Sequence, residues 1–218
     1  MVDLKEFEQK AADLRVLGMK ISIGQDTVYE KYWDEDCRRN IYSASKSFTS
    51  CAVGFAVQEG LIDLDERLMD AFKEDIPNNP DENLKKATVK DLLTMTLGQE
   101  KGFLMGKQRP RMEEQNWVKA SLAIPFVYEP GTHFVYNNVG PYLAGILVQR
   151  RAGCDLLSYL TPRLLKPLGI RKTIWEVDPE GNTFGAGGLF LTVSELHKLG
   201  MFYLQNGCWN GKKLLSKE

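Results

Sequence analysis

Residues 41–50 read Ile-Tyr-Ser-Ala-Ser-Lys-Ser-Phe-Thr-Ser and place Ser43 three residues before Lys46 at the start of an apolar helix. Positions i and i+3 of a helix share one face, so the lysine amine can reach the serine hydroxyl. The N–H groups and positive dipole end at a helix start favour a developing oxyanion. Because a serine hydroxyl is a weak nucleophile without an adjacent base, the stretch predicts a Ser43 nucleophile and a Lys46 base.

The same spacing has a structural interpretation, because serine is a common N-cap and lysine a common residue of helix surfaces. Lysine is a base only when neutral, and burial together with the helix dipole lowers its pKa. We expect the helix to run from Ser43 to about Gly60, which is a plausible C-cap. It is apolar around most of its circumference through Phe48, Cys51, Ala52, Phe55 and Ala56. Such a helix lies in the centre of a domain. A serine at its first position is unusual there unless a cleft reaches it, and this favours a functional role for Ser43.

Composition excludes several classes of protein. The chain has 218 residues, of which 43% are hydrophobic, and this supports a globular core. Its 28 basic and 29 acidic residues give a net charge of −1 without a basic cluster, so we expect no nucleic-acid partner. No apolar run approaches the roughly 18–20 residues that span a bilayer, so we expect a soluble protein without a membrane partner.

The cysteine pattern predicts neither a metal site nor a cofactor. Four cysteines lie far apart, without a Cys-x-x-Cys pair or a histidine cluster, so free buried thiols are expected. The first ten residues contain no apolar run of the kind that marks a secretory signal. We therefore expect a cytoplasmic, reducing location.

The remaining chain predicts an N-terminal hairpin followed by helices. A helix with Leu4 and Leu14 on one face should end near Gly18. Residues 19–23 and 27–33 should pair as strands. The later helices should cover residues 88–95, 112–123 and 139–151, a segment after Asp155, and a segment after the capping box of residues 192–195. The loop from Gly98 to Pro110 is either a cleft wall or a mobile surface loop.

Tyr136 and Asn138 are the candidates for the rest of a catalytic site. A tyrosine can transfer protons when a lysine cation lowers its pKa. The Asn138 amide can donate to a substrate carbonyl and accept a bond from Lys46. Their structural alternatives are a tyrosine at the core edge and a helix N-cap.

Together these stretches resemble the serine β-lactamase and penicillin-binding-protein superfamily, in its class C-like arm of esterases, peptidases and amide hydrolases. Residues 42–49 resemble its first motif, with Ser43 as the acylated nucleophile and Lys46 as the base. Residues 130–138 resemble the second, with Tyr136 and Asn138 in their family roles. Further pieces follow in the family's order at residues 89–96, 167–169, 187–189 and 207–211.

The resemblance implies an α+β, β-lactamase-like fold in one domain over residues 1–218. Residues 1–34 would form its N-terminal helix and hairpin, and residues 41–218 its mainly helical part. Two departures stand out. Gln99 follows Leu97-Gly98 where many members have serine-glycine-leucine, which predicts a differently shaped cleft. The third motif, a lysine or histidine followed one residue later by glycine, is absent, and Lys172, His133 and His197 do not supply it.

The absent motif implies a domain truncated at its C-terminus. In the family, that strand lines the cleft and provides the second N–H of the oxyanion hole, and losing one such donor costs about a hundredfold or more in rate. The hairpin would keep an open edge and an uncovered face, and a lone hairpin is marginally stable. Oligomers could form through that edge.

The sequence therefore predicts a serine hydrolase that forms an acyl-enzyme at Ser43 and cleaves a small ester, amide or β-lactam without a cofactor. An intracellular esterase or amide hydrolase is favoured. The alternative is a non-catalytic fragment or binding protein that keeps the helical scaffold.

Overall fold

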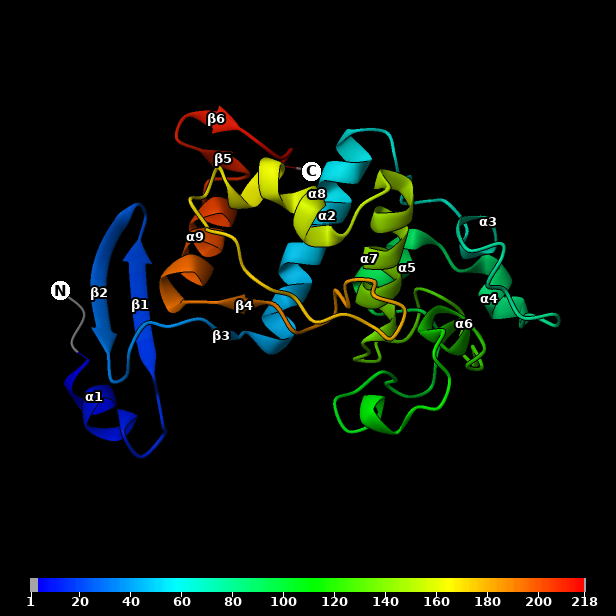
Figure 1. Cartoon of the computed structure of the whole chain (residues 1–218), viewed down its shortest axis with the longest axis horizontal. Coiled ribbons are helices and arrows are strands. Elements are labelled where there is room, and N and C mark those ends of the chain that lie inside the picture. The colour runs from blue at the N-terminus through cyan, green and yellow to red at the C-terminus, as the bar shows by residue number, and fades with distance from the viewer. Residues whose placement is uncertain (1–3, 218) are drawn as a thin grey trace.

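Two long helices form the centre of the computed structural model, which describes residues 4–217 (Figure 1). Helix α2 (Ser45–Gln58) packs against α7 (Val139–Ala152). Phe48 and Tyr142 have exposed fractions of 0%. The predicted central helix is therefore confirmed, although its first regular residue is Ser45. It ends where predicted, because Gly60 adopts a φ of 72° that favours glycine.

Shorter helices cover this pair. Their bounds are α3 (Leu68–Ala71), α4 (Glu82–Lys86), α5 (Val89–Thr94), α6 (Trp117–Leu122), α8 (Leu156–Leu160) and α9 (Val193–Leu204). Single helical turns lie at Tyr42–Ala44, Arg109–Arg111 and Thr161–Leu165. The capping box predicted at Thr192 is present and starts α9, and Thr88 forms a second capping box that starts α5.

Two helices are shorter than predicted. The helix predicted at residues 112–123 begins only at Trp117, because Asn116 Oδ1 accepts the Lys119 N–H at 2.8 Å and caps it. Helix α1 (Lys5–Ala11) ends well before Gly18, because Arg15 adopts a left-handed φ of 53°. Leu14 therefore lies outside the helix and is 65% exposed, so its predicted place on the helix is wrong.

The strands form three separate two-stranded sheets within residues 4–217. The predicted hairpin is confirmed as β1 (Gly18–Ile23) paired antiparallel with β2 (Asp26–Tyr32). Strand β3 (Arg39–Asn40) pairs with β4 (Phe190–Leu191), and β5 (Cys208–Trp209) pairs with β6 (Lys212–Lys213). In this part of the chain no third strand pairs with the hairpin, so both of its edges are open.

The hairpin contacts the rest of the molecule through α9. Ser22 Oγ lies 2.9 Å from His197 Nε2, and Tyr32 OH lies 2.9 Å from Ser194 Oγ. Residues 1–3 and 218 lie outside the described part of the chain, and the single domain over 1–218 stays a prediction.

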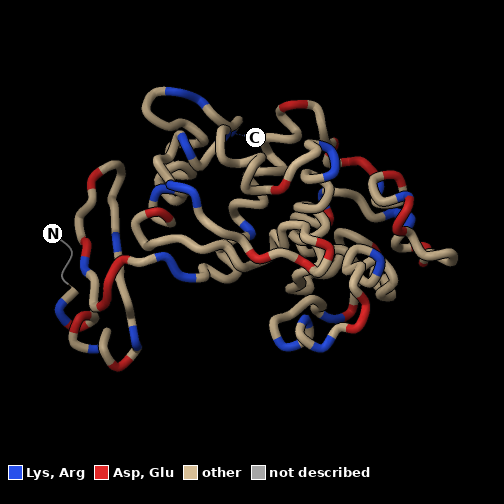
Figure 2. The backbone as a smooth tube through the Cα atoms, viewed as in Figure 1, with Lys and Arg blue, Asp and Glu red and all other residues tan. Residues whose placement is uncertain are grey.

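Charged residues of both signs are distributed over the whole molecule (Figure 2). This distribution agrees with the net charge of −1. Among the described residues, no helix is both long and apolar enough to cross a bilayer.

Candidate active site

A short turn presents Ser43 to solvent directly before α2. Tyr42 has a left-handed φ of 46°, and its N–H donates to Asn40 Oδ1 at 2.7 Å. The Ser45 hydroxyl donates to Tyr42 O at 2.6 Å from the other side. Ser45 is fully buried while Ser43 is exposed, so the turn separates a structural serine from an accessible one.

Three of the four predicted site residues meet at the Ser43 hydroxyl. Lys46 Nζ lies 3.0 Å from Ser43 Oγ, and Tyr136 OH lies 2.7 Å from the same atom. Lys46 Nζ also donates to Ala186 O at 2.5 Å. A neutral amine can make that bond and still direct its lone pair at the Ser43 hydroxyl, which is the arrangement a general base needs.

Electrostatics favour the basic forms of both neighbours. Burial lowers the pKa of Lys46, nearby Tyr136 opposes this shift, and the positive charge of Arg109 adds to it. Burial alone would raise the pKa of Tyr136, but its hydrogen bond to Ser43 and the positive charge of Lys46 outweigh burial and lower the pKa. A proton therefore leaves the Lys46 and Tyr136 pair more readily than it would leave either isolated side chain.

Asn138, the fourth predicted site residue, is the N-cap of α7 and is 8% exposed. Its Nδ2 donates to Leu104 O at 2.9 Å. Its Oδ1 is buried and has no partner among residues 4–217. The expected bond from Lys46 to Asn138 Oδ1 is absent from the structure, in which the Lys46 amine bonds to Ser43 Oγ and Ala186 O instead.

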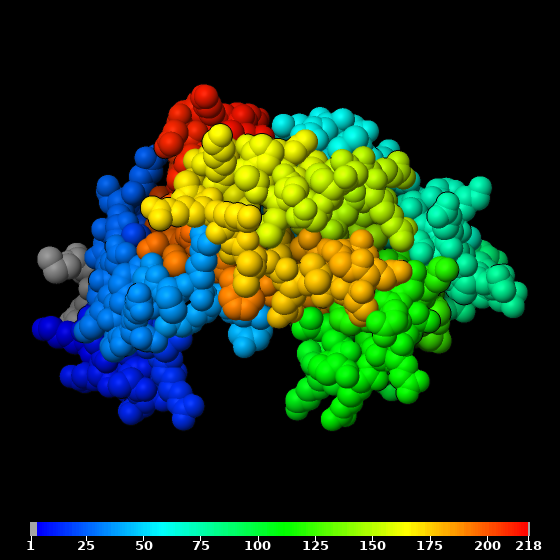
Figure 3. Space-filling view, in the orientation of Figure 1, coloured from blue at the N-terminus to red at the C-terminus, as the bar shows by residue number. Residues whose placement is uncertain are grey.

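The loop after Gly98 packs closely against the segment that carries Tyr136. The Asn138 N–H donates to Phe103 O at 3.3 Å, and a Cβ at Gly102 would lie only 2.7 Å from Tyr136 O. Of the two predictions for this loop, a cleft wall agrees with these contacts better than a mobile surface loop does. Residues 98–110 are called the cleft wall below. Figure 3 shows the molecule hollowed between the N-terminal hairpin and the green segment that contains residues 100–110, and Figure 1 places the first turn of α2 between them.

A second group beside the site was not identified from the sequence. Glu176 Oε2 accepts Arg109 Nη1 at 3.1 Å, and Glu176 Oε1 accepts Asn40 Nδ2 at 3.2 Å. This group connects the cleft wall to Asn40, which holds the turn before Ser43. The three residues lie far apart along the chain, so no spacing pattern could have indicated them.

The described part of the chain contains no group of three or more histidine, cysteine, aspartate or glutamate side chains that could hold a metal ion. Its cysteines are free thiols, as the sequence predicted, but only Cys51 is buried, so the prediction that all four are buried is wrong.

Comparison with known proteins gives a consistent result. A family model described as Beta-lactamase matches residues 5–216. A monacolin J acid methylbutanoyltransferase of Aspergillus terreus is 31% identical over 157 residues, which cover 63% of this chain and 37% of that protein. A lovastatin esterase of Penicillium rubens is 31% identical over 150 residues, covering 59% of this chain and 37% of the relative.

A solved structure with a similar fold is a putative 6-aminohexanoate-dimer hydrolase from Bacillus anthracis. Its TM-score is 0.82 at 20% identity, and the match covers 96% of this chain and 59% of that one. The α+β, β-lactamase-like fold predicted from the sequence is thereby confirmed. The chain spans 37% of the length of the two curated relatives.

Proposed function

Because this chain belongs to the beta-lactamase family, we propose that it is a serine hydrolase in which Ser43 forms an acyl-enzyme with a small ester, amide or β-lactam. One observation carries the proposal. Lys46 and Tyr136 both lie within hydrogen-bond distance of Ser43 Oγ, at 3.0 Å and 2.7 Å. A nucleophile in contact with two groups of lowered pKa is prepared for proton transfer.

In the acylation step, Ser43 Oγ attacks the substrate carbonyl carbon while its proton passes to Lys46. The tetrahedral intermediate then collapses, and the bond to the leaving oxygen or nitrogen breaks as Tyr136 gives that atom a proton. The protonated Lys46 amine then returns its proton directly to Tyr136, to whose hydroxyl it is hydrogen-bonded. Burial of Lys46 favours its neutral form at the start of this cycle.

In the deacylation step, a water or an alcohol attacks the Ser43 ester and gives its proton to Tyr136 or Lys46. The acyl group leaves as an acid or as a new ester, and Ser43 regains its proton. The names of the two curated relatives, an esterase and an acyltransferase, support a carboxylic ester as the substrate.

Asn138 is the proposed substrate-binding residue. Its Oδ1 is buried and lacks a partner in the described part of the chain, so it can accept a bond from Lys46 or from a substrate N–H once the side chain moves. Its Nδ2 would have to exchange Leu104 O for a substrate carbonyl. Ser43 lies at the positive end of α2, which stabilises the oxyanion of the intermediate.

The test is covalent labelling of the 218-residue chain with a fluorophosphonate probe, followed by intact mass. We expect one adduct on the parent protein, none on Ser43→Ala, and an unchanged adduct on Ser158→Ala, which alters an exposed serine of α8. Labelling that survives in Ser43→Ala would exclude Ser43 as the nucleophile. Ester hydrolysis that disappears in Ser43→Ala would extend the result to turnover.

A second candidate is a protein that binds its ligand without turnover. It is favoured by a groove beside Lys46 whose lining residues come only from α2 and α9, namely Lys46, Ser47, Ser50, Leu196, Leu199, Gly200 and Tyr203. Among residues 4–217, no strand residue lines this groove. Turnover that depends on Ser43 would rule this candidate out.

A further inference from the structure

Two buried amide side chains connect the cleft wall to the segment that carries Tyr136. Gln99 is 1% exposed and Asn137 is 3% exposed. Asn137 Nδ2 donates to Gln99 Oε1 at 2.7 Å. Gln99 occupies the position at which the sequence departs from the family's serine-glycine-leucine pattern, so this pair is a feature of this chain that the motifs did not explain.

Each remaining polar atom of the pair has a backbone partner. Gln99 Nε2 donates to Ser121 O in the last turn of α6 at 2.9 Å. Asn137 Oδ1 accepts the N–H of Val139 at 2.9 Å and that of Phe103 at 3.2 Å. The pair therefore fixes α6, the cleft wall and the start of α7 to one another.

Asn137 lies between Tyr136 and Asn138 in the sequence, so whatever holds its side chain also restrains the backbone of both neighbours. Tyr136 itself is 44% exposed and has little packing of its own to fix it. We propose that Gln99 is a positioning residue, which acts through Asn137 to hold the Tyr136 hydroxyl against Ser43. The expected effect on rate rests on the proposed function. The claim that Gln99 fixes the position of Tyr136 does not.

A leucine at position 99 shows what the amide contributes. It would leave the Asn137 Nδ2 and Ser121 O atoms buried without partners, and buried polar groups that lose a partner tend to rearrange or admit water. The segment around Tyr136 would then be free to shift. A displacement of about 1 Å in a catalytic group can cost on the order of a hundredfold in rate.

The experiment compares Gln99→Leu with Gln115→Leu, which makes the same change at an exposed glutamine before α6. We expect Gln99→Leu to lower the rate of fluorophosphonate labelling about 10-fold to 100-fold. We also expect the Tyr136 pKa to rise toward its ordinary value of 10.0, measured by NMR of ring-labelled tyrosine and assigned with Tyr136→Phe. Gln115→Leu should change neither quantity.

The double variant Gln99→Leu/Asn137→Ser tests the route of the effect. If Gln99 acts through Asn137, the double variant should lose no more than the larger of the two single effects. Additive losses would show that Gln99 acts elsewhere. If Gln99→Leu does not fold, Asn137→Ser alone supplies the same two measurements.

The two readouts separate this proposal from the proposed function. A Tyr136 pKa that moves in Gln99→Leu, in a protein whose Ser43 is never labelled, would support positioning and contradict the hydrolase. Unchanged labelling and an unchanged Tyr136 pKa in a folded Gln99→Leu variant would overturn the positioning role.

Discussion

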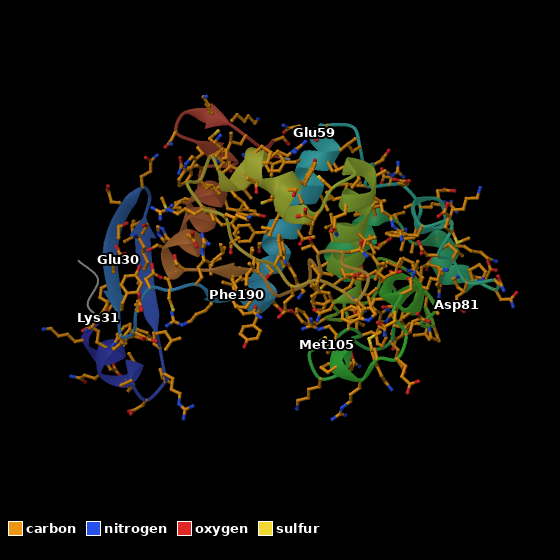
Figure 4. The ribbon with its side chains drawn as sticks, viewed as in Figure 1. Glu30, Lys31, Glu59, Asp81, Met105 and Phe190 are labelled. Atoms are coloured by element: carbon orange, nitrogen blue, oxygen red, sulfur yellow. The ribbon has the colours of Figure 1, made fainter. Side chains whose placement is uncertain are left out.

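The helical body and the N-terminal hairpin are built on different interactions. Helix α7 is buried continuously from Val139 to Gln149, whereas no residue of β1 or β2 is fully buried. Figure 4 shows their separation, with Glu30 and Lys31 on β2 at one end of the molecule and Met105 on the cleft wall toward the other. The hairpin is attached through contacts such as those of Ser22 with His197 and Tyr32 with Ser194.

This difference determines where precise geometry is available. A fully buried large apolar side chain contributes about 1.5–3 kcal/mol, whereas a typical hydrogen bond contributes about 0.5–1.5 kcal/mol net. Ser43, Lys46 and Tyr136 all come from the body or from segments packed on it. We therefore expect the site to depend strongly on the body and weakly on the hairpin.

The largest predicted effect is that of Lys46→Met in the body. Removing the base should lower the rate of fluorophosphonate labelling of Ser43 by about 100-fold to 10,000-fold. Lys20→Met is the matched control, because Lys20 is paired with Glu30 on the hairpin at 2.9 Å. It should leave the labelling rate unchanged, and a comparable loss there would show that the hairpin does support the site.

The next largest effect concerns stability. Phe48 is 0% exposed in α2, so Phe48→Ala should lower the free energy of unfolding by about 3–5 kcal/mol. Phe7 is half-buried and its ring centroid lies 6.0 Å from that of Trp33, so Phe7→Ala should cost only about 1 kcal/mol. Urea unfolding measures the loss of unfolding free energy in each variant. Equal losses in the two variants would contradict the division between the two regions.

A third prediction concerns local opening without any mutation. Amides of β1 and β2 should exchange with deuterium well before those of α2 and α7, because open strand edges and few buried contacts permit local unfolding. Hydrogen exchange followed by mass spectrometry measures this order. Hairpin protection equal to that of α7 would mean that the two regions unfold as one unit.

The smallest predicted effect is a pH dependence of the hairpin's attachment. Burial and the positive charge of Lys20 lower the pKa of His197 below 6.5, and Glu30 opposes this only in part. His197 therefore binds a proton more tightly in the unfolded state than in the folded state. The stability that the neutral imidazole contributes is fully present above about pH 6.5 and is lost as the pH falls through the folded pKa.

Exchange of the hairpin amides at pH 5.5 and pH 8, corrected for intrinsic rates, measures this effect. We expect more opening at pH 5.5 in the parent protein and none of this dependence in His197→Gln. If the ratio of exchange rates at pH 5.5 and pH 8 is the same in His197→Gln as in the parent protein, the pH dependence belongs to other groups.

The local features of the fold could be predicted from the sequence because they depend on short-range chemistry. Thr88 and Thr192 cap helices through atoms within three residues of themselves, and β1 and β2 pair across a short turn. The prediction was wrong at Leu14, where periodicity favoured a longer helix and the left-handed Arg15 ended it. Helix ends depend on backbone bonds that periodicity does not express.

The sequence by itself determined which reactive groups are present and that Lys46 can reach Ser43, because three residues make almost one helical turn. Only the tertiary structure decided that Tyr136, 93 residues away, contacts the same hydroxyl, and that Ala186 O receives the Lys46 amine. It also decided that Gln99 and Asn137 meet in the cleft wall. Such contacts arise from the packing of α7 on α2 and the closure of long loops, whose energies are spread over many side chains and leave no pattern of spacing in the chain.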